Sequence, residues 1–304
     1  MYENFYGLKE KPFSLLPDPG FLYLGQKHSM ALALLQYSLL NRAAITILSG
    51  EIGSGKTTLI RHILNQVTDD VTVGMITNTH RKFGELMQWV NLAFGLPYEK
   101  KGEVALYQQF IDFLIDGYAR GQHSILIIDE AQNLDLEALE EIRLLSNINA
   151  DKDQLLQLIM VGQPELREKL RRPELVQFIQ RVSVAYHLKP FNPDETDRYI
   201  PHRLRIAGGD PDLFEPLAKR LIHEESTGIP RLVNILCDTA LVYGFAEEKR
   251  TIDLDLVRDV VKDKVLATRS TQGQQTNGDE SSTANQRETV VPGAFSASQH
   301  KKTP

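Results

Sequence analysis

The most constraining feature of this sequence is the stretch GEIGSGKT at 50–57, which fits the pattern G-x-x-x-x-G-K-[ST]. The apolar run AITILS at 44–49 precedes it, and the amphipathic run TLIRHILNQ begins directly after it. Glycines between a strand and a helix let successive backbone N–H groups point at phosphate oxygens, and the helix N-terminus favours negative charge. The stretch therefore predicts a loop that binds nucleotide phosphates. A glycine-rich turn without a ligand is the weaker interpretation, because the pattern and its strand-helix context agree.

The residues of this loop have distinct predicted roles. Lys56 is expected to reach the β- and γ-phosphates, and the hydroxyl of Thr57 is expected to coordinate Mg²⁺. The predicted ligands are ATP and Mg²⁺. The predicted nucleotide-contacting residues are Gly50, Glu51, Ile52, Gly53, Ser54, Gly55, Lys56, Thr57 and Thr58.

A pair of acids, Asp129 and Glu130, follows the apolar run SILII at 124–128. Adjacent acids at the end of a buried strand suit two different tasks. Asp129 can hold Mg²⁺, and Glu130 can orient and deprotonate the attacking water. Taken alone, the acids could simply cap the helix that follows. Paired with the phosphate-binding loop, they predict an enzyme that hydrolyses ATP.

Three further polar residues are weaker candidates. Gln163 follows the apolar run at 155–162, where it can contact the γ-phosphate or the attacking water, although a turn residue before a proline has the same pattern. Arg181 ends a predicted helix, where a cation compensates the helix C-terminus without any other function. Arg231 stands in TGIPRLVNIL at 227–236, in the first turn of a helix, where a cation opposes the helix dipole. That unfavourable position indicates an anionic partner elsewhere in the fold, for which the γ-phosphate is the natural candidate, although a linker between two helices has the same pattern.

Apolar runs alternate with amphipathic helical stretches up to about residue 190. Continuous apolar strands separated by helices are typical of a parallel sheet that is buried on both faces, with right-handed crossovers. The sequence therefore predicts a three-layer α/β fold with a five-stranded parallel sheet. The predicted strands are 44–49, 71–76, 124–129, 155–162 and 182–188.

Composition divides the chain into four segments. Residues 1–25 mix aromatic residues with prolines and are expected to form an ordered, irregular arm without helix or strand. Residues 26–190 form the α/β domain, and residues 191–267 read as four helical pieces of a small all-helical domain. Residues 268–304 are rich in Ser, Thr, Gln and Gly and are expected to be disordered, because they can bury too little apolar surface.

The overall composition limits the partners and the location. The net charge is −6, from 34 basic and 40 acidic residues, which gives no global attraction to nucleic acid. The longest apolar tract, at 30–40, is too short for a membrane span, and no signal-peptide pattern begins the sequence. The expected location is the cytoplasm, with any membrane contact made through a partner. Cys237 lies in an apolar helical run and is expected to be a core residue.

Six motifs follow one another along the sequence, and their order is characteristic: FYGLKEKPFSLLPDPGFLYLGQKHSMALALLQYSLL, GEIGSGKTTLIR, IDEAQNL, VGQPELREKLRRPELVQFIQRV, YHLKPF and TGIPRLVNILCDTAL. Together they resemble the AAA+ superfamily of ring-forming ATPases. More closely, they resemble the ATPase domain of the general secretion pathway protein A (ExeA-like) family. The resemblance covers residues 1 to about 266, and the motifs are specific in combination.

The resemblance implies a role for each of the weaker candidates. Gln163 would be the sensor-1 residue, and Arg231 would be the sensor-2 residue of a helical lid. Arg181 would be an arginine finger that reaches the γ-phosphate of a neighbouring subunit, and the arm at 13–25 would wrap the adenine. Arginines spread the negative charge of the transferred phosphoryl group. The resemblance thus implies an ATPase that acts as a homo-oligomeric, hexameric ring.

Members of the family assist the assembly of secretion, pilus or polysaccharide-export machinery. The expected partners are therefore membrane-associated proteins of such an apparatus, with the chain cytoplasmic or peripheral at the inner membrane. Longer members continue into a transmembrane helix and a peptidoglycan-binding domain. This sequence shows neither, so cell-wall binding is not carried over.

Two alternatives to an assembly ATPase stay open. The family also resembles DNA-directed ATPases of transposition and replication, which would use the basic clusters THRKF at 79–83 and REKLRRPEL at 167–175. Such clusters more often form solvated helix faces, and the acidic total agrees with that interpretation. The other alternative is a nucleotide-dependent switch with little turnover, which would need neither Glu130 nor Arg181.

Overall fold

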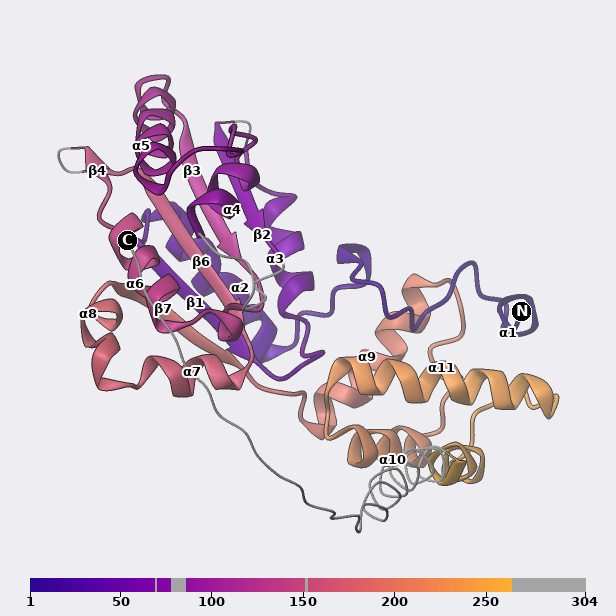
Figure 1. The fold of residues 1–304 in the computed structure, drawn as a ribbon. Coiled ribbons are helices and arrows are strands. Elements are labelled where there is room, and N and C mark those ends of the chain that lie inside the picture. Colours follow the sequence, from indigo (N-terminus) through magenta and orange to yellow (C-terminus); the bar gives the residue numbers. More distant parts are fainter. Residues whose placement is uncertain (69, 78–85, 151–152, 264–304) are drawn as a thin grey trace, which may run out of the picture. The chain divides into compact units, whose positions relative to one another are not determined.

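The computed structural model describes residues 1–68, 70–77, 86–150 and 153–263. Its centre is a parallel sheet of five strands in the order β2-β3-β6-β1-β7 (Figure 1). The sheet confirms the predicted fold class, and each strand lies within one residue of its predicted bounds. The strands are β1 (Ile45–Gly50), β2 (Val71–Ile76), β3 (His123–Ile128), β6 (Leu156–Gly162) and β7 (Val182–Leu188).

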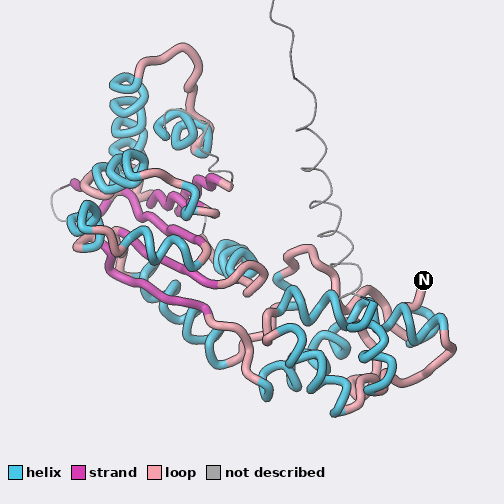
Figure 2. Tube along the Cα trace, turned by 60° about the horizontal axis from the view of Figure 1, so that its bottom comes forward, coloured by secondary structure: helices cyan, strands magenta, loops and turns pink. Residues whose placement is uncertain are grey.

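The sheet is buried on both faces because alternate residues of its strands pack against different helices. Ile45 and Ile47 of β1 belong to one hydrophobic cluster, and Leu48 belongs to another. Each buried Ile or Leu side chain contributes about 1.5–3 kcal/mol relative to exposure, so the ends of the strands are held firmly. Figure 2 shows the strands between helices. One face is covered by α2 (Gln26–Leu40) and α3 (Lys56–Leu64), and the other by α4 (Leu86–Ala93), α5 (Glu103–Ala119), α6 (Leu136–Leu145), α7 (Pro164–Leu170) and α8 (Val176–Ile179).

A helical region follows the sheet. Its first helix begins with a capping box, in which Asn192 and Glu195 satisfy each other's backbone N–H groups. Cys237 is fully buried in its core, as expected. The helices are α9 (Pro193–Ile206), α10 (Pro216–Ser226) and α11 (Pro230–Ala246), followed by a helical stretch from residue 254.

The N-terminal arm packs into the core of this helical region. Phe13 is buried against Phe214 with the ring centroids 5.9 Å apart. The prediction that the arm has no helix is wrong for one turn, α1 (Glu3–Tyr6), which ends at Gly7 with φ +70°. One turn is too short to show a hydrophobic period, and an isolated turn is unstable without such packing. The remaining arm is irregular, apart from a single 3₁₀ turn at Pro19–Phe21.

Two short strands were not predicted, and two predicted segments lie outside the described residues. The sequence does not predict β4 (Asn149–Ala150) and β5 (Asp153–Gln154), because two-residue strands carry no alternation. The tail at 268–304 and the basic cluster at 79–83 lie outside the described residues. Among the described residues, no helix combines the length and the apolar character that crossing a bilayer requires.

Candidate active site

The predicted phosphate-binding loop lies where β1 ends and α3 begins. β1 is flanked by β6 and β7 in a parallel sheet. Because the loop follows the C-terminal end of β1, it stands at the carboxyl edge of the sheet, where open α/β folds bind their ligands. Gly53 and Gly55 have φ angles of +80° and +96°. Glycine adopts these left-handed conformations without the strain that a side chain adds. The local fold is therefore the strand, loop and helix that the sequence pattern predicts.

Lys56 is buried at the start of α3 with its ammonium group against the loop. Its Nζ donates hydrogen bonds to the carbonyl oxygens of Gly50 at 2.8 Å and Glu51 at 2.9 Å. Burial lowers the pKa of Lys56, and the nearby charges of Glu130 and Asp129 partly offset this. Among the described residues, the hydrogen-bond acceptors of this buried cation are neutral carbonyls. A phosphate oxygen is a stronger, charge-assisted acceptor, so the position suits a site for an anion.

Thr57 and Asp129 meet beside the loop. The Thr57 hydroxyl donates to a carboxylate oxygen of Asp129 at 3.1 Å. Burial raises the pKa of Asp129, whereas hydrogen bonds from Thr57 and from the backbone of Glu130 lower it, and the net shift is upward. A hydroxyl and a carboxylate next to a phosphate-binding loop are the hard oxygen ligands that Mg²⁺ prefers. The residues present therefore fit Mg²⁺.

Glu130 follows in a left-handed conformation, with φ 53° and ψ 36°. A carboxylate oxygen of Glu130 accepts a hydrogen bond from Gln163 Nε2 at 2.9 Å, which brings the two predicted residues together. The same oxygen accepts one from Gln132 Nε2 at 2.5 Å. Sequence reasoning missed Gln132. Its position directly after the acid pair, in DEAQ, was the available signal, but no spacing rule distinguishes it from a turn residue.

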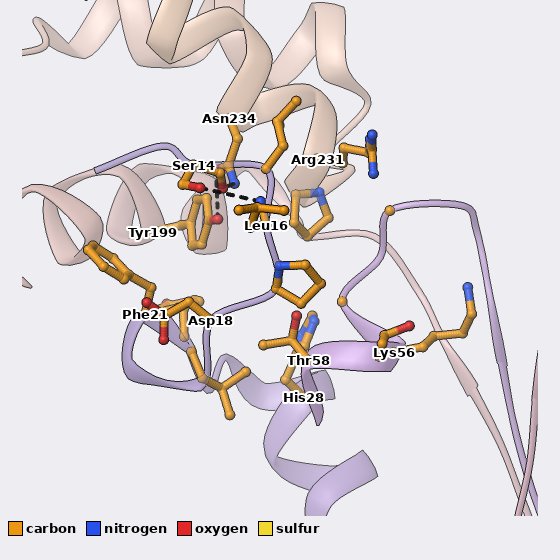
Figure 3. A pocket seen from close by; sticks show the side chains of 18 of the residues that line it. Ser14, Leu16, Asp18, Phe21, His28, Lys56, Thr58, Tyr199, Arg231 and Asn234 are labelled. Atoms are coloured by element: carbon orange, nitrogen blue, oxygen red, sulfur yellow. Dashed lines mark hydrogen bonds between the residues drawn. The ribbon is translucent and has the colours of Figure 1, made fainter. Parts of the chain in front are cut away.

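A cavity of about 230 Å³ joins the loop to the arm and the helical region (Figure 3). Residues 14–18 and 21–23 of the arm form one wall of this cavity. They belong to the segment that the family resemblance places against the adenine. Of the predicted site residues, those lining the cavity are Ile52, Gly53, Gly55, Lys56, Thr57, Thr58, Glu130, Gln163 and Arg231. The other predicted residues of the loop and of the acid pair do not line the cavity: Gly50, Glu51, Ser54 and Asp129.

The arm is held in this position by polar side chains of α9 and α11, which sequence reasoning also missed. Asn234 Nδ2 donates to the carbonyl oxygen of Ser14 at 3.3 Å, and Tyr199 donates to Asn234 at 2.7 Å. Arg203 Nε donates to the carbonyl oxygen of Pro12 at 2.5 Å, and its guanidinium lies 4.4 Å from the ring centre of Phe21. Asn234 is a polar residue within the mostly apolar α11, which was the available signal, whereas α9 is polar along most of its length and gives none.

Arg231 lies at the other side of the cavity, where α11 approaches the loop. Its backbone N–H donates to the carbonyl oxygen of Gly53 at 3.1 Å. A side chain at position 53 would place its Cβ 2.5 Å from the Cβ of Arg231, so this approach requires glycine. In Figure 3, Arg231 and Lys56 stand beside the loop that lies between them. The predicted lid residue is thus brought to the predicted phosphate site.

Gly228 fixes the turn that carries Arg231. Its φ is +73°, and an added Cβ would lie 2.1 Å from the backbone oxygen of Phe191. Because a backbone atom cannot move aside as a side chain can, we expect Gly228→Ala to lower the free energy of unfolding by about 2–4 kcal/mol in urea titrations. Gly117→Ala is the matched control. Gly117 lies within α5, and the atom nearest to an added Cβ, Gln122 Oε1, would be 3.9 Å away, so alanine should raise stability by about 0.5–1 kcal/mol. Equal effects at both positions would contradict this account of the turn.

Arg181 is the one predicted site residue that the fold leaves apart from the others. It is exposed between α8 and β7 and does not line the cavity of its own chain. The second basic cluster, at 167–175, lies on α7 and the turn after it, where Glu168 and Glu174 alternate with the cations. A mixed-charge surface of this kind is typical of a solvated helix face.

Known proteins resemble this chain in sequence and in fold. A family model described as an AAA domain matches residues 40–170. Over 253 residues, which is 83% of this chain, the sequence is 40% identical to general secretion pathway protein A of Aeromonas hydrophila. The chain spans 46% of the length of that relative.

Solved structures share the fold. The ORC2 protein of Aeropyrum pernix matches with a TM-score of 0.60 at 18% identity, over 84% of this chain and 71% of that chain. Cdc6p from Pyrobaculum aerophilum matches with a TM-score of 0.60 at 17% identity, over 78% and 68%. The RuvB branch migration motor of Thermotoga maritima matches with a TM-score of 0.52 at 16% identity, over 79% and 69%. At these identities the likeness concerns the fold alone. The matched domain and the sequence identity show that the chain contains an AAA domain and is related to general secretion pathway protein A.

Proposed function

We propose that this chain hydrolyses ATP in the cavity between the loop, the arm and the helical lid. One observation carries the proposal: the loop, the Thr57 and Asp129 pair, and the Glu130 and Gln163 pair meet at one edge of the sheet. The arm supplies the apolar wall that an adenine needs, and Lys56 supplies the cation that phosphates need. Each of these groups has a use in nucleotide hydrolysis, and a glycine-rich turn without a ligand needs none of them.

The residues divide the work of hydrolysis between them. The loop amides and Lys56 bind and orient the phosphates. Thr57 and Asp129 would hold Mg²⁺, which when bound neutralises charge on the phosphate oxygens. Glu130 orients the attacking water and accepts its proton, while Gln163 holds the Glu130 carboxylate and senses the γ-phosphate position. Arg231 reaches the γ-phosphate from the lid, so that lid position depends on whether ATP or ADP is bound.

Arg181 acts on the site of a neighbouring subunit in a hexameric ring. Its exposure, and its absence from the residues that line the cavity of its own chain, support a role in trans. An arginine supplied by a neighbour stabilises the charge of the transferred phosphoryl group and contributes about 10³–10⁵ in kcat in known cases. Hydrolysis then depends on assembly, because an isolated subunit has an incomplete site.

Mixing two inactive variants tests this division between neighbours. An Arg181→Ala subunit keeps its own site, and a Lys56→Ala subunit keeps its finger. Mixed, they should therefore regain phosphate release at interfaces where an intact site meets an intact finger. Arg231→Ala mixed with Lys56→Ala is the matched control, because both changes damage the site of their own chain. It should regain nothing. Recovery in the control mixture, or its absence from the first mixture at every ratio, would contradict the assignment of Arg181.

We further propose that the ATPase cycle drives assembly or remodelling of a secretion, pilus or polysaccharide-export apparatus. In this role the chain would be cytoplasmic, attached to the inner membrane through a partner. The support is the 40% identity to a protein named for the general secretion pathway. The test is capture of partners from membrane extracts by tagged Glu130→Gln protein with ATP or ADP. Export proteins should be retained in ATP only, and equal retention in both nucleotides would speak against a coupled cycle.

A further inference from the structure

We propose that Gln132 is a positioning residue for hydrolysis, holding the carboxylate of Glu130 and the backbone of Gln163 in a fixed relation. This inference rests on the proposed ATPase function. Gln132 Nε2 donates to a Glu130 oxygen at 2.5 Å, and Gln132 Oε1 accepts the backbone N–H of Gln163 at 3.0 Å. Gln163 Nε2 closes the ring by donating to the same Glu130 oxygen at 2.9 Å. Three residues from two strand ends thus form one closed hydrogen-bonded network.

The backbone around Glu130 is shaped to bring Gln132 into this ring. Glu130 occupies a left-handed conformation, which costs a non-glycine residue of order 1–3 kcal/mol. The single 3₁₀ turn Ala131–Asn133 follows, and the N–H of Asn133 donates back to the Glu130 carbonyl at 3.0 Å. This turn reverses the chain so that the side chain of residue 132 faces the carboxylate of residue 130. Backbone strain is common at functional sites, and here the strained residue is the one whose carboxylate Gln132 holds.

Gln132 is itself held from the opposite side. Lys169 of α7 donates to its backbone carbonyl and to that of Leu134. An added Cβ at Gly162 would lie 3.0 Å from Gln132 Oε1, so the end of β6 leaves room for the amide. The position of the side chain is therefore set by β6 and α7 as well as by its own turn.

The chemistry of an amide matters here, because both of its ends are used. A backbone N–H can only donate, so the Gln132 oxygen must face Gln163 and the Gln132 NH₂ group must face the carboxylate. Glutamate at this position keeps the shape and the acceptor but replaces the donor with a second negative charge. Methionine keeps the length and loses both hydrogen bonds. Neither substitute can hold a carboxylate and a backbone N–H at the same time.

The structure assigns Gln132 no contact with the adenine wall of the cavity, so the expected loss is in turnover and not in binding. A misplacement of about 1 Å can cost about 10²-fold in rate. We expect Gln132→Met and Gln132→Glu to lower kcat about 10- to 100-fold, with the Kd for ATP changed less than about twofold. Gln108→Glu is the matched control, because Gln108 also donates to a carboxylate, that of Asp112, on the exposed side of α5. It should leave kcat unchanged.

A double-mutant cycle distinguishes positioning from a general structural effect. If Gln132 acts through Glu130, then Gln132→Met should lower the residual turnover of Glu130→Gln no further. An equal fold-loss in both backgrounds, or a loss of ATP affinity that matches the loss of kcat, would overturn the inference. So would normal kcat in both Gln132 variants while the unmodified chain is active. An unmodified chain and Gln108→Glu that both fail to release phosphate would contradict the proposed function itself.

Discussion

Replacing Glu130 with glutamine is expected to stop ATP turnover while leaving ATP bound. The side chain keeps its size and can still meet Gln163, but an amide cannot accept the proton of the attacking water. General base catalysis contributes about 10²–10⁴ in rate, so kcat should fall by about that factor. The Kd for ATP should stay within a few-fold, because the loop, Lys56 and the arm are unchanged. Phosphate release and direct ATP titration measure the two quantities.

The control for this change is Glu99→Gln, which makes the same substitution at an exposed position between α4 and α5. It should turn over ATP like the unmodified chain. Wild-type turnover in Glu130→Gln would contradict the assignment of the base. If the unmodified chain binds ATP but is as slow as Glu130→Gln, the alternative of a nucleotide-dependent switch is the better account.

Replacing Lys56 with alanine is expected to weaken nucleotide binding strongly, with little cost to the stability of the nucleotide-free chain. Hydrogen bonds to charged groups contribute about 1.5–3 kcal/mol each, so losing the ammonium group should weaken ATP binding by about 10²-fold or more. Without nucleotide, burial disfavours the charge, as the lowered pKa of Lys56 indicates. Removing the charge therefore relieves a desolvation penalty in the free chain.

Thermal melts with and without ATP measure the nucleotide binding and the stability of the nucleotide-free chain. ATP at about 100 times its Kd should stabilise the unmodified chain by about 2.7 kcal/mol, and the same ATP concentration should leave the Tm of Lys56→Ala nearly unchanged. Lys11→Ala, an exposed lysine of the arm, should keep the full ATP-induced shift. A Lys56→Ala chain that ATP stabilises as strongly as the unmodified chain would show that the nucleotide binds elsewhere.

The parts of this account that the sequence predicts are local. GEIGSGKT and the acid pair are short patterns next to strongly apolar strands, so the sequence alone identifies them and the elements that they join. The contacts that complete the site are not local. Asn234 and Ser14 are 220 positions apart, and no periodicity connects α11 with the arm. Gln132 escaped prediction for a different reason, since its role depends on the left-handed turn at Glu130, which a non-glycine residue rarely adopts.

The helix-dipole argument predicts a functional role from sequence for Arg231 but not for Arg181. A cation in the first helical turn is unfavourable, and that argument led from the sequence to Arg231, which the fold brings to the loop. A cation just after a helix is favourable, so Arg181 gives no such signal. Its proposed role rests on a surface that a single chain does not complete.

The most direct test is phosphate release from ATP by the purified chain, measured with Mg²⁺ over a range of protein concentrations. The account predicts hydrolysis that chelation of Mg²⁺ stops. It also predicts that activity per subunit rises with concentration and then levels off, because each site needs the Arg181 of a neighbour. Absence of phosphate release at every concentration, from protein that binds ATP, would contradict the central claim. Activity per subunit that is constant at every concentration, down to the monomer, would contradict the shared site.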